Sequence, residues 1–156
     1  MLTIVATLTA AQLLIAAPLQ AVGTTRDEVE QRLGAPIGVG VDYVASPYLE
    51  GAKDRVVTLD YAKAVVRLYE MPERHLSFLI SYVAAEDLVR TGSAVGVGSD
   101  HATVLRELGG PFYEDDDQIV YADPRPDAPD QSDRLRILLK DGRVVGYEWR
   151  FALVPR

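Results

Sequence analysis

The chain has 156 residues, enough for one domain of ordinary size or for two very small ones. Its 48% hydrophobic and 25% charged residues are typical of a globular protein, and its net charge of −7 argues against nonspecific nucleic-acid binding, which depends on Lys and Arg. There is no cysteine, which excludes disulfides, thiolate nucleophiles and cysteine-based zinc sites.

The first 21 residues are apolar and carry no charged side chain. Pro18 lies near the end of this stretch, and the small residue Ala21 closes it, as in a secretory signal peptide. We therefore predict a signal peptide over residues 1–21, cleaved after Ala21, and a periplasmic or secreted protein. An uncleaved membrane anchor is the main alternative, because a span needs about 20 apolar residues, and a buried helix is the third. Membrane contact would then occur only through residues 1–21.

Two stretches of the chain have nearly the same sequence, VGTTRDEVEQRLGAP at residues 22–36 and VGVGSDHATVLRELGGP ending at Pro111. Residues that match without a gap include Val22 with Val97, Gly23 with Gly98, Val29 with Val104, Leu33 with Leu108, Gly34 with Gly109, and Pro36 with Pro111. Agreement at so many aligned positions indicates an internal duplication rather than chance.

Each of these stretches predicts a short helix with both ends marked. Thr25 and Asp100 are typical N-cap residues, whose side-chain oxygens accept hydrogen bonds from free backbone amides. Gly34 and Gly109 suit the left-handed position that ends a helix, and a proline two residues later prevents its continuation. We therefore expect helices within residues 24–34 and 99–109.

The segments that follow each helix predict antiparallel strands, at residues 42–46, 55–70 and 75–84 in the first half and 117–123 and 133–153 in the second. Asp141-Gly142 is a strong signal for a tight hairpin turn. Alternating side chains predict one apolar face, which the helix covers, and one face toward water. The expected apolar rows are Leu76, Phe78, Ile80 and Tyr82, and Leu135, Ile137, Leu139, Val145, Tyr147, Trp149, Phe151 and Leu153.

Residues 124–132 are rich in proline and other turn-forming residues, so we expect a loop there rather than a central strand. The sequence as a whole predicts an α+β fold with two tandem repeats, each a helix plus an antiparallel meander. The first repeat spans residues 22–90 and the second residues 91–156, after the N-terminal hydrophobic segment.

The phrase GTTRDEVEQRLGAP and the later segments QIVYAD and LRILLKDGRVVGYEWR resemble the BamE/SmpA/OmlA family. Two such units in tandem resemble the arrangement of β-lactamase inhibitory protein (BLIP). The resemblance implies helix-on-sheet modules of the bacterial cell envelope that bind other proteins without chemistry, in one case assisting outer-membrane protein assembly. The chain lacks the lipid-carrying cysteine of the assembly lipoproteins and the disulfides of the secreted inhibitor.

The sequence offers no evident catalytic, cofactor or metal site. Its two histidines, His75 and His101, stand apart from any motif for catalysis, and no nucleotide-binding glycine fingerprint is present. The acidic run at residues 114–117 lacks the spacing of a calcium loop and is typical of a solvated turn. We therefore expect no enzyme activity, no cofactor and no nucleic-acid partner.

The remaining functional signal is the outer face of the expected sheet, where Tyr and Arg are favoured contact residues in protein interfaces. From the alternation we expect a protein-contact face made of Lys63, Arg67, Tyr69, Arg136, Glu148 and Arg150. The favoured function is a protein-binding module of the cell envelope. The alternatives are a secreted inhibitor of a hydrolase such as a β-lactamase, and an unrecognised enzyme.

Overall fold

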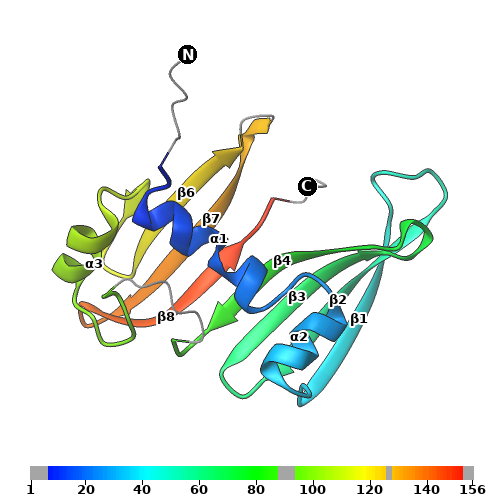
Figure 1. Cartoon of the computed structure of the whole chain (residues 1–156), viewed down its shortest axis with the longest axis horizontal. Helices are drawn as coiled ribbons and strands as arrows, with labels where there is room; N and C mark the ends of the chain where they lie inside the picture. Colours follow the sequence, from blue (N-terminus) through cyan, green and yellow to red (C-terminus); the bar gives the residue numbers. More distant parts are fainter. Residues whose placement is uncertain (1–6, 88–93, 126–127, 153–156) are drawn as a thin grey trace.

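The computed structural model describes residues 7–87, 94–125 and 128–152 and shows an α+β fold. Within these residues an eight-stranded antiparallel sheet is accompanied by three α-helices (Figure 1). The helices are α1 (Ala10–Ala21), α2 (Arg26–Leu33) and α3 (His101–Leu108). The strands are β1 (Gly38–Ala45), β2 (Lys53–Tyr61), β3 (Ala64–Met71), β4 (Leu76–Ala84), β5 (Tyr113–Glu114), β6 (Gln118–Arg125), β7 (Ala128–Lys140) and β8 (Arg143–Arg150), and a short 3₁₀ helix occupies Pro72–Arg74.

The strand order in the sheet is β1-β2-β3-β4-β8-β7-β6-β5. The strands β1 to β4 form one meander and β5 to β8 a second, and the last strands of the two meanders meet in the middle of the sheet. There Ser81–Ala84 of β4 pair with Tyr147–Arg150 of β8. The predicted boundary between residues 90 and 91 lies outside the described residues.

The predicted helices α2 and α3 are confirmed, with the expected caps. The Thr25 hydroxyl accepts a hydrogen bond from the amide three residues on at 3.2 Å, and the Asp100 carboxylate does the same at 2.8 Å. Both helices end on a glycine with positive φ, 84° at Gly34 and 82° at Gly109, a backbone region that glycine enters without a Cβ clash. The cap signals in the sequence were therefore sufficient to place these helices.

A tyrosine hydroxyl binds the carbonyl of the glycine that ends each of these helices. Tyr61, at the end of β2, donates to Gly34 at 2.9 Å, and Tyr121, in β6, donates to Gly109 at 2.8 Å. Since these glycine carbonyls lie beyond the helical hydrogen-bond pattern, the tyrosines fix the helix ends to the sheet.

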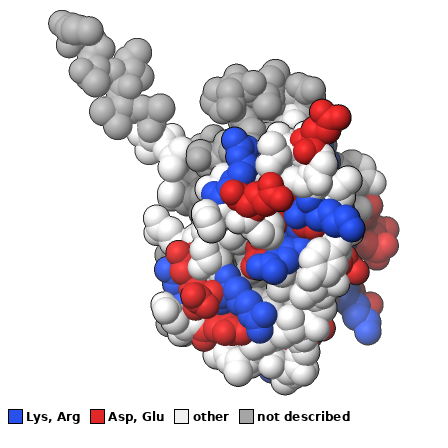
Figure 2. All heavy atoms as spheres, turned by 90° about the vertical axis from the view of Figure 1, so that its right-hand side faces the viewer, with Lys and Arg blue, Asp and Glu red and all other residues white. Residues whose placement is uncertain are grey.

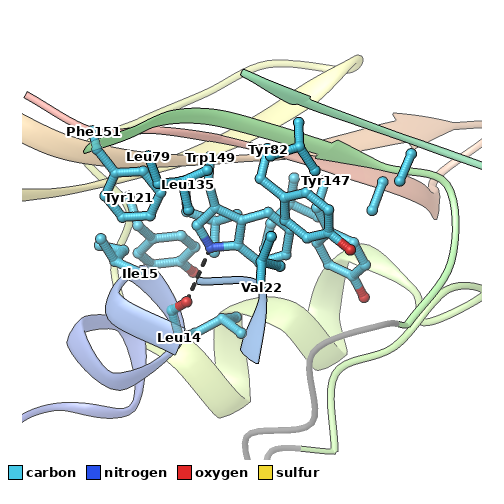
Figure 3. Packing of buried hydrophobic residues seen from close by; sticks show 14 of the residues in the cluster. Leu14, Ile15, Val22, Leu79, Tyr82, Tyr121, Leu135, Tyr147, Trp149 and Phe151 are labelled. Atoms are coloured by element: carbon cyan, nitrogen blue, oxygen red, sulfur yellow. Dashed lines mark hydrogen bonds between the residues drawn. The ribbon is translucent and has the colours of Figure 1, made fainter. Parts of the chain in front are cut away.

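The helix α1 packs against the apolar side chains of the sheet (Figure 3), and α2 and α3 contribute to the same core. Leu14 and Ile15 are buried, and Trp149 of β8 donates from its indole nitrogen to the Leu14 carbonyl at 3.0 Å. The sequence favoured a cleaved signal peptide over a buried helix for residues 1–21, and cleavage after Ala21 would remove this packing. In the described residues no helix is long and apolar enough to cross a membrane.

Two shifts of strand register change which side chains enter the core, so two predicted apolar rows were partly wrong. One shift lies between Arg67 and Leu68 in the pairing of β3 with β4, and it places Leu79 opposite Leu68 in the core, instead of Leu76, Phe78 and Ile80. The other lies between Leu138 and Leu139 in the pairing of β7 with β8, where Val144 is buried and Val145 exposed. Such bulges cannot be read from simple alternation.

The predicted loop at residues 124–132 was also wrong in large part. The strand β6 continues to Arg125 and β7 begins at Ala128, with Pro124 paired to Ser132. Proline is tolerated here because β5 covers only the other end of β6, so this part of β6 lies at the sheet edge, where an amide donor is not needed. The predicted hairpin at Asp141-Gly142 is confirmed, with positive φ at both residues.

Candidate protein-contact face

The face of the sheet that points away from the helices carries a group of arginines. Arg67 extends from β3, Arg136 from β7 and Arg150 from β8, and these side chains line two adjoining hollows. Arg134, two residues before Arg136 on β7, lines one of the same hollows. We call Arg67, Arg134, Arg136 and Arg150 the arginine face.

Glu148 lies at the centre of the arginine face and lines both hollows. The strand register sets it directly opposite Arg136 on one side and Val83 on the other. Its side chain is only 11% exposed, and its two carboxylate oxygens accept hydrogen bonds from Arg136 and Arg150. These charge-assisted bonds hold both guanidinium groups over the sheet surface.

The face has more positive than negative charge, because Glu148 is the one acidic residue among those that line the hollows. Within the described residues Arg67 and Arg134 make no salt bridge, and Arg134 instead lies over the ring of Phe112, 5.2 Å from its centroid. The side of the molecule shown in Figure 2 has basic and acidic side chains interleaved. Arginine binds carboxylates in a bidentate manner, which suits such a face to an acidic ligand.

The structure brings together four of the six residues that the sequence predicted for a contact face: Arg67, Arg136, Glu148 and Arg150. Tyr69 is instead buried, and its hydroxyl donates to the Asp54 carboxylate at 2.7 Å, while burial raises its pKa. Lys63 lies in the turn between β2 and β3 and pairs with Glu86 at 3.6 Å, in a different hollow. These two are not part of the arginine face.

Sequence reasoning missed Arg134, although a signal for it was present. It lies two residues from Arg136 on the same strand, so alternation places both on the same side of the sheet. The strand predicted over residues 133–153 contains Arg134, so the same alternation that selected Arg136 also applies to it.

The acidic residues at 114–117 form a hydrogen-bonded turn. The Asp115 carboxylate accepts from the backbone amides of Asp117 at 2.8 Å and Gln118 at 3.0 Å, and these bonds keep its pKa low. Glu114 pairs with His101 at 2.8 Å. Across the described ranges, no three or more His, Asp or Glu side chains gather in a way that could hold a metal ion. The other histidine, His75, adopts a left-handed backbone conformation after the 3₁₀ helix.

No protein-family model, curated protein or solved structure matches this chain.

Proposed function

We propose that this protein is a non-catalytic binding module of the bacterial cell envelope, which uses the arginine face to bind an acidic surface of another protein. The observation that carries the proposal is the placement of four arginines around one nearly buried glutamate, in a chain whose net charge is −7. Guanidinium groups held by a fixed acceptor lose little conformational freedom when they bind a carboxylate. The envelope location rests on the resemblance of residues 23–36 and of the later segments QIVYAD and LRILLKDGRVVGYEWR to the family named above.

We also propose that the two meanders are copies of one ancestral unit. The helices α2 and α3 end on corresponding glycines, and in each half a tyrosine of the sheet binds that glycine's carbonyl. The strand order is symmetrical about the β4–β8 pair, so that each strand of one half has a counterpart in the other. In this arrangement β8 and β4 correspond, and the arginine face spans the junction of the two copies.

The direct test measures binding of an oligo-glutamate peptide to the full chain by isothermal titration calorimetry. We expect wild-type protein to bind this peptide, with affinity that falls as salt is added, and an Arg134→Gln/Arg150→Gln variant to lose most of the affinity. The matched control is Arg106→Gln on α3, whose side chain is 68% exposed against 73% for Arg150 and which likewise lies beside a glutamate. Equal binding by wild type and the double variant would contradict the proposal.

A second experiment asks for the natural partner. Cross-linking in an envelope extract should capture a protein with wild type and with Arg106→Gln, and not with the double variant. If the captured protein is a hydrolase that the chain inhibits, the inhibitor alternative replaces the assembly role while the binding face stands. Capture that is the same for all three proteins would show that the arginine face is not the contact surface.

A further inference from the structure

The two edge strands of the eight-stranded sheet differ in how well they are protected against pairing with another chain. At one edge lies β5, which is two residues long and leads into the acidic turn. At the other lies β1, which pairs with β2 over all eight of its residues without a register shift (Figure 1). Long edge strands are normally protected by charged side chains, especially Lys, by Pro, by a bulge or by a covering element. The sequence of β1, GVGVDYVA, contains neither Pro nor Lys and has a single charged residue, Asp42, and no described strand pairs with its outer side.

The backbone of β1 has a defined set of groups that point outward. Antiparallel pairs alternate between hydrogen-bonded and non-bonded positions. The amide of Ser46 donates to the Ala52 carbonyl at 3.0 Å, so the even-numbered residues of β1 are the ones hydrogen-bonded to β2. The amides and carbonyls of Val39, Val41 and Tyr43 therefore point away from β2, toward the open edge.

The side chains of these same three residues form an apolar row. Val39, Val41 and Tyr43 alternate with the intervening residues and so lie on one side of the sheet, and each is exposed. Ile37, just before the strand, is also exposed, but its amide donates to the Asp60 carbonyl of β2 at 2.8 Å, so it does not belong to the set that points outward. Backbone donors and acceptors thus coincide with an uncovered apolar surface, which is the combination that an added strand would bury.

We propose that β1 pairs antiparallel with β1 of a second copy of this chain, about a two-fold axis through Val41. In this register Val41 lies opposite Val41 of the second copy, and Val39 lies opposite Tyr43 in both directions. The outward amides and carbonyls of all three residues then find partners across the axis. Cross-strand pairs of aromatic and β-branched residues stabilise such contacts.

The charge pattern of β1 favours this register and a second copy as the occupant. Asp42 is the one charged residue of the strand. An axis through Val41 sets Asp42 opposite Gly40 of the second copy, which has no side chain to obstruct it. An axis through Asp42 would instead set two carboxylates directly opposite each other, which is unfavourable. The Val41 register pairs residues 38–44 of the two strands, and it closes both β1 edges, so that assembly stops at a dimer.

The first test is the mass of the full chain by light scattering during size-exclusion chromatography, over about 1 to 100 μM, the range that resolves a micromolar complex. We expect wild type to be a dimer at the upper end and Val41→Lys to be a monomer, because it sets two ammonium groups opposite each other. Val145→Lys is the matched control, since Val145 of β8 is 42% exposed and Val41 is 43% exposed. A monomeric wild type throughout, or species larger than a dimer, would overturn the proposal.

The second test uses the absence of natural cysteine. In Val41→Cys the only thiol of each copy would lie on the two-fold axis, at a Cα separation of about 5.5 Å, which a disulfide can bridge. Mild oxidation should therefore convert Val41→Cys to a covalent dimer much faster than Val145→Cys. Circular dichroism checks that each variant is folded. Equal rates of cross-linking in the two folded variants would exclude this pairing.

Discussion

The indole nitrogen of Trp149 donates a hydrogen bond to the Leu14 carbonyl of α1. This carbonyl has no donor within the helix, because residue 18 is proline. In an α-helix the carbonyl of residue 14 accepts from the amide of residue 18, and proline has no amide hydrogen. The side chain of β8 therefore satisfies a buried group that the helix cannot satisfy by itself. This hydrogen bond between β8 and α1 helps to hold the N-terminal helix against the sheet.

A double-mutant cycle tests this relationship. Trp149→Phe should lower the free energy of unfolding by about 3 kcal/mol, because it leaves the Leu14 carbonyl without a donor and loses packing. In a Pro18→Ala background the new amide of residue 18 can bind that carbonyl, so the same change should cost about 1 kcal/mol less. Urea denaturation of the four proteins gives the coupling. A cost that is the same in both backgrounds would mean that the hydrogen bond contributes nothing.

A second prediction concerns the packing of α1 as a whole. Ile15 is 1% exposed and Leu13 is 49% exposed on the same helix. Ile15→Ala should therefore destabilise the protein by about 2–5 kcal/mol, and Leu13→Ala by less than about 1 kcal/mol. Thermal unfolding of the full chain measures both.

The same reasoning applies to the predicted cleavage site. A chain that begins at Val22 lacks all the packing of α1 and should lose its cooperative unfolding transition, since total stabilities are only about 5–15 kcal/mol. If this shorter chain instead unfolds as cooperatively as the full one, α1 is dispensable and removal of residues 1–21 is compatible with the fold. Mass spectrometry of the protein from its native cell would then show which form exists.

A third prediction concerns Tyr82, which stacks on Trp149 with ring centroids 5.3 Å apart. Its hydroxyl is buried and has no hydrogen-bond partner among the described residues. Tyr82→Phe should therefore raise the free energy of unfolding by about 1 kcal/mol, because a buried polar group without a partner is removed. Tyr121→Phe is the contrasting control, which should lower it by about 1 kcal/mol through loss of the bond to Gly109. An equal decrease in the free energy of unfolding in both variants would mean that the Tyr82 hydroxyl does have a hydrogen-bond partner.

A fourth prediction concerns alkaline pH. Burial, with a smaller contribution from Glu114, raises the pKa of Tyr121 to about 12, from about 10 in an unfolded chain. The folded protein therefore holds this proton more tightly, so the stability that it contributes is complete below pH 10 and is lost as the pH rises through about 12. Urea denaturation as a function of pH should show a shallower alkaline decline in Tyr121→Phe. If stability declines equally in wild type and Tyr121→Phe, the ionisation of Tyr121 does not contribute to the loss of stability at alkaline pH.

The cap residues explain why the helices α2 and α3 could be predicted from sequence. Thr25 and Gly34, like Asp100 and Gly109, act through contacts within a few residues, which a sequence shows directly. The strand faces were predicted less well, because β4 has an extra residue, Ile80, opposite the Arg67–Leu68 step of β3, which reverses the alternation in β4 and depends on the partner strand.

The grouping of the arginine face could be predicted in part, because alternation along a strand is also a local property of the sequence. Arg136, Glu148 and Arg150 lie on regular strand segments, so alternation placed them correctly. Tyr69 lies on the expected side of β3, but its burial with Asp54 depends on a contact fifteen residues away. The packing of α1 depends on Trp149, which is 135 residues from Leu14, and nothing in an apolar N-terminal stretch reveals such a distant donor.

The pairing of β4 with β8 has a consequence for how such a sheet could arise. Half a molecule, with only one meander, would leave its last strand unpaired, and a strand of this kind readily associates with its own duplicate. Two identical short proteins joined in this way would already contain the central seam of the present sheet. Fusion of their genes would then link two subunits that already associated through this strand pair, and the sequence of each half could afterwards diverge.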